Sequence, residues 1–175
     1  NGVARRGVAK IDPTTGAVDP TFKSPLDGNV TDARFACGRL IVSGAFSKRM
    51  LALDPTTGAD TGYLALGISG TVATGAGPVR VYRFAVDPTC SRLVGIGNFT
   101  TVGGQTRYRA FMADLGPTSG TVDPWYYAPL QRQCAAHLDY LQVEGVLALL
   151  RSLATPGRVV RSEEHTSELQ SRNDI

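Results

Sequence analysis

Two pairs of aspartates have a spacing at which the chain could hold a cation. Asp12 and Asp19 flank one copy of a short polar segment, and Asp54 and Asp60 flank another. A calcium loop of the EF-hand type needs oxygen ligands at alternate positions and a central glycine. The Pro-Thr-Thr-Gly that follows each first aspartate does not supply that order. Because aspartate also caps tight turns through its own backbone, we expect turn-capping carboxylates here and no metal site.

Two further patterns suggest phosphate or nucleic-acid binding. Residues 95–100 read Gly-Ile-Gly-Asn-Phe-Thr, which lacks the third glycine of a dinucleotide fingerprint and the helix that presents its N-terminus to phosphate. Residues 80–83 and 107–109 interleave arginine with tyrosine, as binders of single strands do, but on a β-strand this pattern also describes a solvated face. With a formal net charge of only +3, we expect neither a nucleotide cofactor nor a nucleic-acid partner.

Two candidate sites lie toward the C-terminus. His137 and Asp139 could form half of a catalytic or metal site, but no serine, cysteine or second native histidine stands in a recognisable arrangement with them, so we expect a surface role. Trp125, Tyr126 and Tyr127 form the densest aromatic cluster. We expect these rings to pack between repeats, and they are also the best available platform for a sugar ligand.

The chain has three cysteines, Cys37, Cys90 and Cys134. An odd number allows at most one internal bridge. Cys37 and Cys90 each lie two residues before an Arg-Leu pair, in equivalent turns of two repeats. The two alternatives are a structural disulfide that includes Cys134 and free, inert thiols, and we favour free thiols.

The strands and turns that position these residues are predicted from a short sequence motif that occurs three times. Asp-Pro-Thr-Thr-Gly begins at residues 12 and 54, and Gly-Pro-Thr-Ser-Gly begins at residue 116. Proline sets φ at the first turn position, aspartate or threonine bonds the local backbone, and glycine accepts the positive φ that closes the turn. The expected structural turn residues are Asp12, Pro13, Gly16, Asp54, Pro55, Gly58, Pro117 and Gly120.

Alternating apolar residues between these loops predict an all-β chain. The expected strands cover residues 8–11, 17–22, 31–35, 39–45, 50–53, 63–66, 79–86, 92–98 and 107–115. The loops begin at positions 12, 54 and 116, which gives steps of 42 and 62 residues. The first step matches a propeller blade of roughly 40–50 residues. The longer second step is explained by insertions within residues 67–78 and 100–109.

The C-terminal part breaks this pattern. Residues 131–160 contain no repeat loop, and they are either an irregular connection or a segment whose reading frame has been lost. Residues 161–171 resemble, codon for codon, the translation of a common sequencing-library adapter. We therefore expect residues 161–175 to be a non-native, exposed tail that makes few contacts with residues 1–130 and contributes nothing to stability.

The repeated phrases resemble a known family. Residues 99–107 read Phe-Thr-Thr-Val-Gly-Gly-Gln-Thr-Arg, and the loops continue into Val-Asp-Pro and an aromatic residue after the first and third copies. Over about residues 1–130 the chain is similar to the delta-type propeller repeats of exported bacterial proteins. The third loop departs from the pattern with Gly116 in place of aspartate. The resemblance implies four-stranded β-propeller blades, about three of them here, in a segment that starts inside a longer protein.

From this resemblance we expect a non-enzymatic segment of a secreted or cell-surface protein that acts as a scaffold or interaction module. The alternative is a carbohydrate-binding or carbohydrate-active propeller whose site lies in other blades. The expected partner is an unidentified protein or carbohydrate, and no cofactor is expected. No apolar stretch reaches the length of a transmembrane helix, so we expect no membrane span in this segment.

Overall fold

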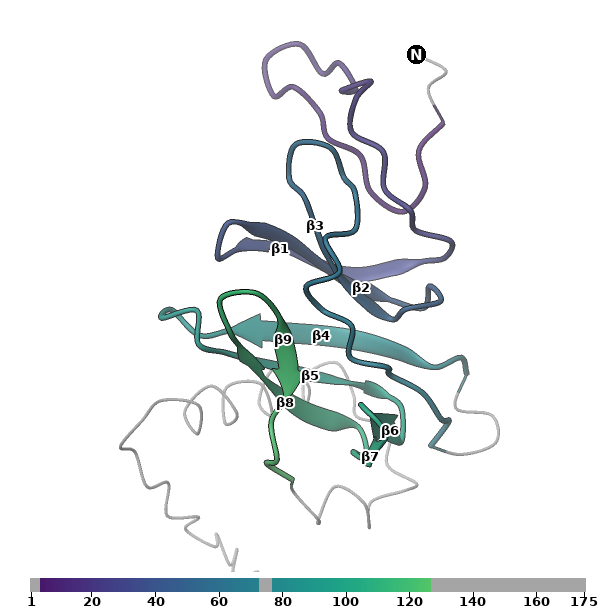
Figure 1. Cartoon of the computed structure of the whole chain (residues 1–175). Helices are drawn as coiled ribbons and strands as arrows, with labels where there is room; N and C mark the ends of the chain where they lie inside the picture. Colours follow the sequence, from purple (N-terminus) through teal and green to yellow (C-terminus); the bar gives the residue numbers. More distant parts are fainter. Residues whose placement is uncertain (1–3, 73–76, 127–175) are drawn as a thin grey trace, which may run out of the picture.

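The computed structural model describes residues 4–72 and 77–126, which form nine β-strands and no helix (Figure 1). The all-β prediction is therefore confirmed for the described part of the chain. The expectations for Tyr127, Cys134, His137, Asp139 and residues 131–175 lie outside the described residues.

Two antiparallel sheets and one small hairpin make up the fold. The first sheet has the order β1-β2-β3 and the second has the order β4-β5-β8-β9, so each is a simple meander. The small hairpin pairs β6 with β7. The bounds are β1 Val30–Ala36, β2 Arg39–Gly44, β3 Met50–Leu53, β4 Arg80–Val86, β5 Arg92–Asn98, β6 Thr101–Val102, β7 Gln105–Thr106, β8 Ala110–Leu115 and β9 Gly120–Val122.

The two sheets are copies of one unit, as the repeated phrases predicted. The register of β1 on β2 shifts between Val30 and Asp32, and the register of β4 on β5 shifts between Val81 and Arg83. At these bulges the partner strands carry Gly44 and Gly97. A Cβ on Gly44 would lie 2.0 Å from the Asn29 carbonyl oxygen, and one on Gly97 would lie 2.1 Å from that of Arg80. The glycines are required because the bulged strand approaches too closely for any side chain.

A second pair of equivalent positions lies just before the third strand of each sheet. Arg49 and Arg109 have left-handed backbones, with φ of 63° and 64°. The carbonyl oxygen of Arg49 accepts from the Gly44 amide at 2.9 Å, and that of Arg109 accepts from the Gly97 amide at 2.8 Å. Phe46 and Phe99 are both buried at the same corners. The repeat therefore extends to backbone conformation and core packing.

Three of the expected strands are not strands. Residues 8–11 and 17–22 form only one bridge, between Ile11 and Val18, and residues 63–66 form no ladder. The apolar residues of the last segment are buried all the same. The carbonyl oxygen of Tyr63 accepts from the Gly120 amide at 2.8 Å, so this segment bonds to the first residue of β9 in the following repeat instead of to its own sheet.

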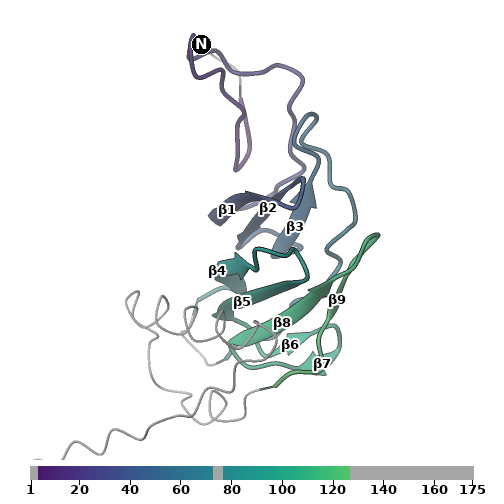
Figure 2. The ribbon, with the colours of Figure 1, turned by 90° about the vertical axis from the view of Figure 1, so that its left-hand side faces the viewer.

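The hydrophobic core has one cluster between the two sheets and a smaller one on the opposite face of the first sheet. Its largest cluster joins Ile41 of the first sheet to Phe84 and Phe111 of the second, and a smaller cluster around Leu53 includes Leu26. The backbone amide of Phe84 also donates to Asp32 Oδ2 at 3.3 Å across the junction. Figure 2 shows the two sheets stacked one above the other. The described sheets do not close into a ring, so a propeller is not established by them.

The expectation of free thiols is wrong for two of the cysteines. Cys37 and Cys90 form a disulfide, with their Cα atoms 5.8 Å apart. Cys37 lies in the turn between β1 and β2, and Cys90 lies in the turn between β4 and β5. Packing β1 and β2 against β4 brings these equivalent turns together. The sequence does not predict this pairing, because nothing in it sets the distance between repeats.

Candidate functional site

The aspartates that begin the first two loops are turn caps, as predicted. Asp12 Oδ1 accepts hydrogen bonds from the amides of Thr14 and Thr15, each at 2.8 Å. Asp54 Oδ1 accepts from the amides of Thr56 at 2.9 Å and Thr57 at 2.7 Å. Because these bonds favour the charged carboxylate, the Thr15 and Thr14 amides lower the pKa of Asp12 and the Thr57 bonds lower that of Asp54.

The closing glycines also take the predicted conformation. Gly16 has φ of 68° and Gly58 has φ of 77°. The Gly16 amide donates to the Asp12 carbonyl oxygen, and the Gly58 amide donates to that of Asp54. The two loops therefore share one hydrogen-bond pattern, as their identical residues require.

The third loop lies at the same corner but forms a different turn. Its strands stay paired for longer, with Leu115 opposite Gly120, and the Gly116 amide donates to the Ser119 carbonyl oxygen at 3.0 Å. Gly120 belongs to β9 and is not among the glycines with positive φ. The expected turn role of Gly120 is therefore wrong. The physical reason is that Gly116 has no carboxylate to cap a six-residue turn, so the ladder extends and the turn tightens.

The second aspartate of each pair forms an ion pair. Asp19 lies 3.3 Å from Lys10, and Asp60 lies 2.7 Å from Lys48. Hydrogen bonds from the hydroxyl and amide of Thr21, with a smaller contribution from Lys10, lower the pKa of Asp19 to about 2. Among the described residues, no group of three or more His, Cys, Asp or Glu side chains is placed to hold a metal ion.

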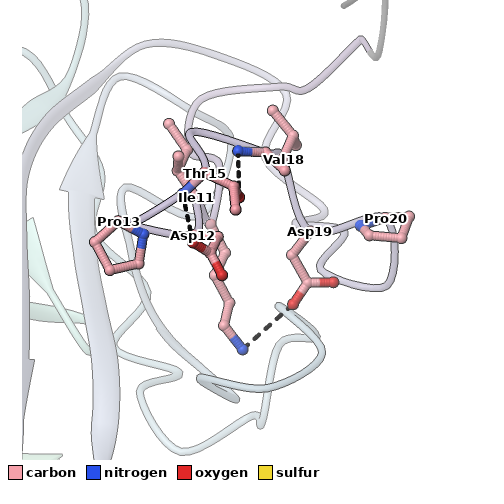
Figure 3. Close-up of a pocket in the computed structure, with 9 residues that line it drawn as sticks. Ile11, Asp12, Pro13, Thr15, Val18, Asp19 and Pro20 are labelled. Carbon is pink, nitrogen blue, oxygen red and sulfur yellow. Dashed lines mark hydrogen bonds and ion pairs between the residues drawn. The ribbon is translucent and has the colours of Figure 1, made fainter.

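A hollow of about 400 Å³ lies between the arms of the first hairpin (Figure 3). Its walls are the loop itself and the segment that leaves it, and the Lys10–Asp19 ion pair closes one side. Ile11, which lines it, is 56% exposed. Three titratable side chains line it, those of Lys10, Asp12 and Asp19, and two of them are joined in the ion pair. The rest of the lining is apolar except for Thr15.

The glycines of residues 95–100 serve packing. Gly95 and Gly97 lie within β5, and no helix follows them in the described residues. A Cβ on Gly95 would lie 2.5 Å from the ring of Phe111 on β8. The glycine therefore leaves room for a buried ring in the neighbouring strand, which explains this part of the pattern without a ligand.

The arginine-tyrosine segments are engaged within the chain. Arg107 is only 6% exposed, and its Nη2 donates to Gln105 Oε1 at 2.7 Å and to the Asp123 carbonyl oxygen at 3.0 Å. Its guanidinium lies over the ring of Tyr126 at 5.5 Å, and that of Arg80 lies over Tyr82 at 5.3 Å. These contacts favour the packing interpretation over nucleic-acid binding.

Two members of the predicted aromatic platform are described. Trp125 and Tyr126 are both half-buried, and the Trp125 amide donates to Asp123 Oδ1 at 2.6 Å. Burial, followed by the neighbouring Tyr108, raises the pKa of the Tyr126 phenol. Because Arg107 lies over the Tyr126 ring, that ring does not offer both faces to a sugar.

Two contacts that join the repeats have little indication in the sequence. One is the Cys37–Cys90 disulfide, for which the matching turn positions were the available signal. The other places the Arg39 guanidinium 3.8 Å from the centre of the Tyr63 ring, a close cation–π contact. Arg39 belongs to the Arg-Leu pair that follows Cys37, but nothing in that pattern relates it to Tyr63.

No helix in the described residues is long and apolar enough to cross a membrane. Comparisons with protein-family models, curated proteins and solved structures found no match to this chain.

Proposed function

We propose that this chain is a non-enzymatic segment of β-propeller repeats that serves as a scaffold or interaction module of a secreted or cell-surface protein. The observation that carries the proposal is that successive repeats are held together by specific contacts at matching places. A disulfide joins equivalent turns, and the segment after each of the first two hairpins lies on the loop of the next repeat. Such nearest-neighbour contacts are what a repeat array needs in order to be rigid.

The disulfide supports the cellular location in this proposal. Disulfides persist in oxidising compartments and are rare in the reducing cytosol. Non-reducing peptide mapping of the protein, recovered after secretion, is expected to find the peptides of Cys37 and Cys90 linked. Recovery of both as reduced thiols would contradict a role outside the cell.

The chemistry-bearing side chains support a structural role. Asp12 and Asp54 cap turns, and Arg107 holds the backbone of residues 106 and 123. Each of these three groups stabilises a loop or a strand. Of the three, only Asp12 lines the hollow of the first hairpin. A scaffold interpretation accounts for them without further assumptions.

A fluorescence titration separates this function from the carbohydrate alternative. Trp125 is the only tryptophan in the chain, so its emission reports directly on the aromatic cluster. Titration with a panel of neutral and acidic oligosaccharides is expected to leave the emission unchanged. A saturable change that Tyr126→Ala removes, while Tyr82→Ala in the other arginine–tyrosine contact leaves it intact, would favour the carbohydrate-binding function.

A further inference from the structure

The first hairpin carries a surface that is covered in the next repeat but bare here. Ile11 and Leu53 both stand immediately before an Asp-Pro-Thr-Thr-Gly-Ala loop, and each bridges the residue seven positions on. Leu53 is 0% exposed, whereas Ile11 is 56% exposed. Gly58 is likewise buried and Gly16 exposed. The two loops share their sequence but differ in their surroundings. Leu53 belongs to β3 and pairs with Leu40 of β2, whereas Ile11 lies in no sheet, and the second loop is also covered by another segment of the chain.

The cover of the second loop is the segment of chain that precedes β1. The Lys23 amide donates to the Thr57 carbonyl oxygen at 2.7 Å. A Cβ on Gly58 would lie 3.0 Å from the Lys23 backbone, whereas one on Gly16 would meet nothing within 4 Å. Three residues beyond Lys23, Leu26 enters the same buried cluster as Leu53. The cover thus supplies one backbone donor and one apolar side chain.

The third loop is covered in a related way. The segment after the second hairpin bonds to it through the Tyr63 carbonyl oxygen and the Gly120 amide, and the Tyr63 hydroxyl donates to the Gly116 carbonyl oxygen at 2.6 Å. In both cases an extended segment from one repeat lies on the hairpin loop of the next. The first loop is the one of the three on which no such segment lies in the described part of the chain.

We propose that the first loop binds an extended segment of the same type as residues 19–26, Asp-Pro-Thr-Phe-Lys-Ser-Pro-Leu, presented by another repeat. The backbone amide at the lysine position of that segment would donate to the Thr15 carbonyl oxygen, the counterpart of Thr57. Its terminal leucine would cover Ile11, as Leu26 shares a cluster with Leu53. Because the six loop residues are identical in the two copies, the partner that fits one fits the other. This inference rests on the proposed function and names the chemistry of the partner.

The test uses the full chain labelled with ¹⁵N and a synthetic peptide of residues 19–26, acetylated and amidated at its ends. Titration is expected to give saturable shifts of the Gly16 and Ala17 amide signals. In a control peptide, proline replaces the lysine and removes the amide that would donate to the Thr15 carbonyl oxygen. This peptide is expected to bind about tenfold more weakly, because one hydrogen bond is lost. Ile11→Ser is expected to reduce binding of the original peptide, while Phe35→Ser, which alters another exposed apolar residue at 67% exposure, leaves it unchanged.

Three outcomes would overturn the proposal. One is the absence of saturable shifts at Gly16, and another is equal binding of both peptides. The third is a chain that sediments as a dimer without peptide and becomes monomeric on Ile11→Ser, since the occupant would then be a second copy. None of these results bears on the disulfide mapping or the tryptophan titration, so this inference and the proposed function fail separately.

Discussion

Cys37 and Cys90 occupy the same position in two successive β-hairpin turns, and a disulfide joins them across the junction between the sheets. Both residues have left-handed backbones, with φ of 55° and 58°. The two turns therefore share conformation as well as sequence position. The bond fixes the spacing of adjacent repeats at the end of the sheets where the hairpin loops lie.

The disulfide is expected to contribute strongly to stability. It closes a loop over a sequence separation of 53 residues, and the chain-entropy model gives about 4 kcal/mol for a loop of that size, near the upper end of measured effects. The variant with both Cys37→Ala and Cys90→Ala should therefore unfold at a lower denaturant concentration. Its free energy of unfolding should be lower by about 2–4 kcal/mol. Urea unfolding followed by circular dichroism measures this difference.

Reductant supplies the control for that experiment. Reducing the wild-type protein should lower its free energy of unfolding toward that of the double variant, and reductant should not change the double variant itself. Equal stability of oxidised and reduced wild-type protein would contradict the structural role of the bond.

The glycines of the first two loops form a matched pair. Valine at Gly16 or at Gly58 should destabilise the protein by roughly 1–2 kcal/mol, because a side chain is disfavoured at positive φ. Gly58→Val should cost about 1–3 kcal/mol more, since its side chain would also collide with the Lys23 backbone. Thermal unfolding of the two variants side by side measures the difference. Equal losses would show that the cover of the second loop is not tightly packed.

Low pH should destabilise the hairpin loops. Hydrogen bonds lower the folded-state pKa values of Asp12, Asp19 and Asp54 below their ordinary value of 3.8. Such groups stabilise the folded state above the unfolded pKa, and this stabilisation is lost as the pH falls through the folded pKa. The free energy of unfolding should therefore decrease between about pH 4 and pH 2, the value to which the pKa of Asp19 is lowered.

Asp54→Asn provides the control for the pH experiment. Asparagine keeps an oxygen that accepts the bonds of the Thr56 and Thr57 amides but does not titrate. Urea unfolding across the acid range should then show a shallower loss of stability than in the wild-type protein. A profile identical to the wild type would remove Asp54 from the explanation.

Gly95 should be sensitive to the smallest substitution. Gly95→Ala places a methyl group 2.5 Å from the ring of Phe111, and overpacking of this kind costs roughly 1–3 kcal/mol. Phe111→Leu gives up part of the ring, so the double variant should lose less stability than the two single variants together. A double-mutant cycle measures this coupling, and strict additivity would show that the two residues do not meet.

The sequence alone predicted the features that depend on local geometry. The turns around Asp12 and Asp54 follow from the conformational limits of proline and glycine and from the reach of an aspartate side chain, which the neighbouring residues settle. The strands from Val30 to Leu53 and from Arg80 to Leu115 follow largely from alternating apolar residues. Their repetition follows from the repeated phrase itself.

The tertiary structure decided the features that depend on distance between repeats. Whether Cys37 meets Cys90, whether Tyr63 bonds to its own sheet or to the next loop, and whether Ile11 is covered all depend on how one sheet packs on another. The third loop is a separate, local case: Gly120 aligns with Gly16 in sequence, but Gly116 has no capping carboxylate, so the longer ladder places Gly120 in a strand. Residues with the same local preference thus have different roles, since packing between sheets, which a repeat pattern does not specify, determines their surroundings.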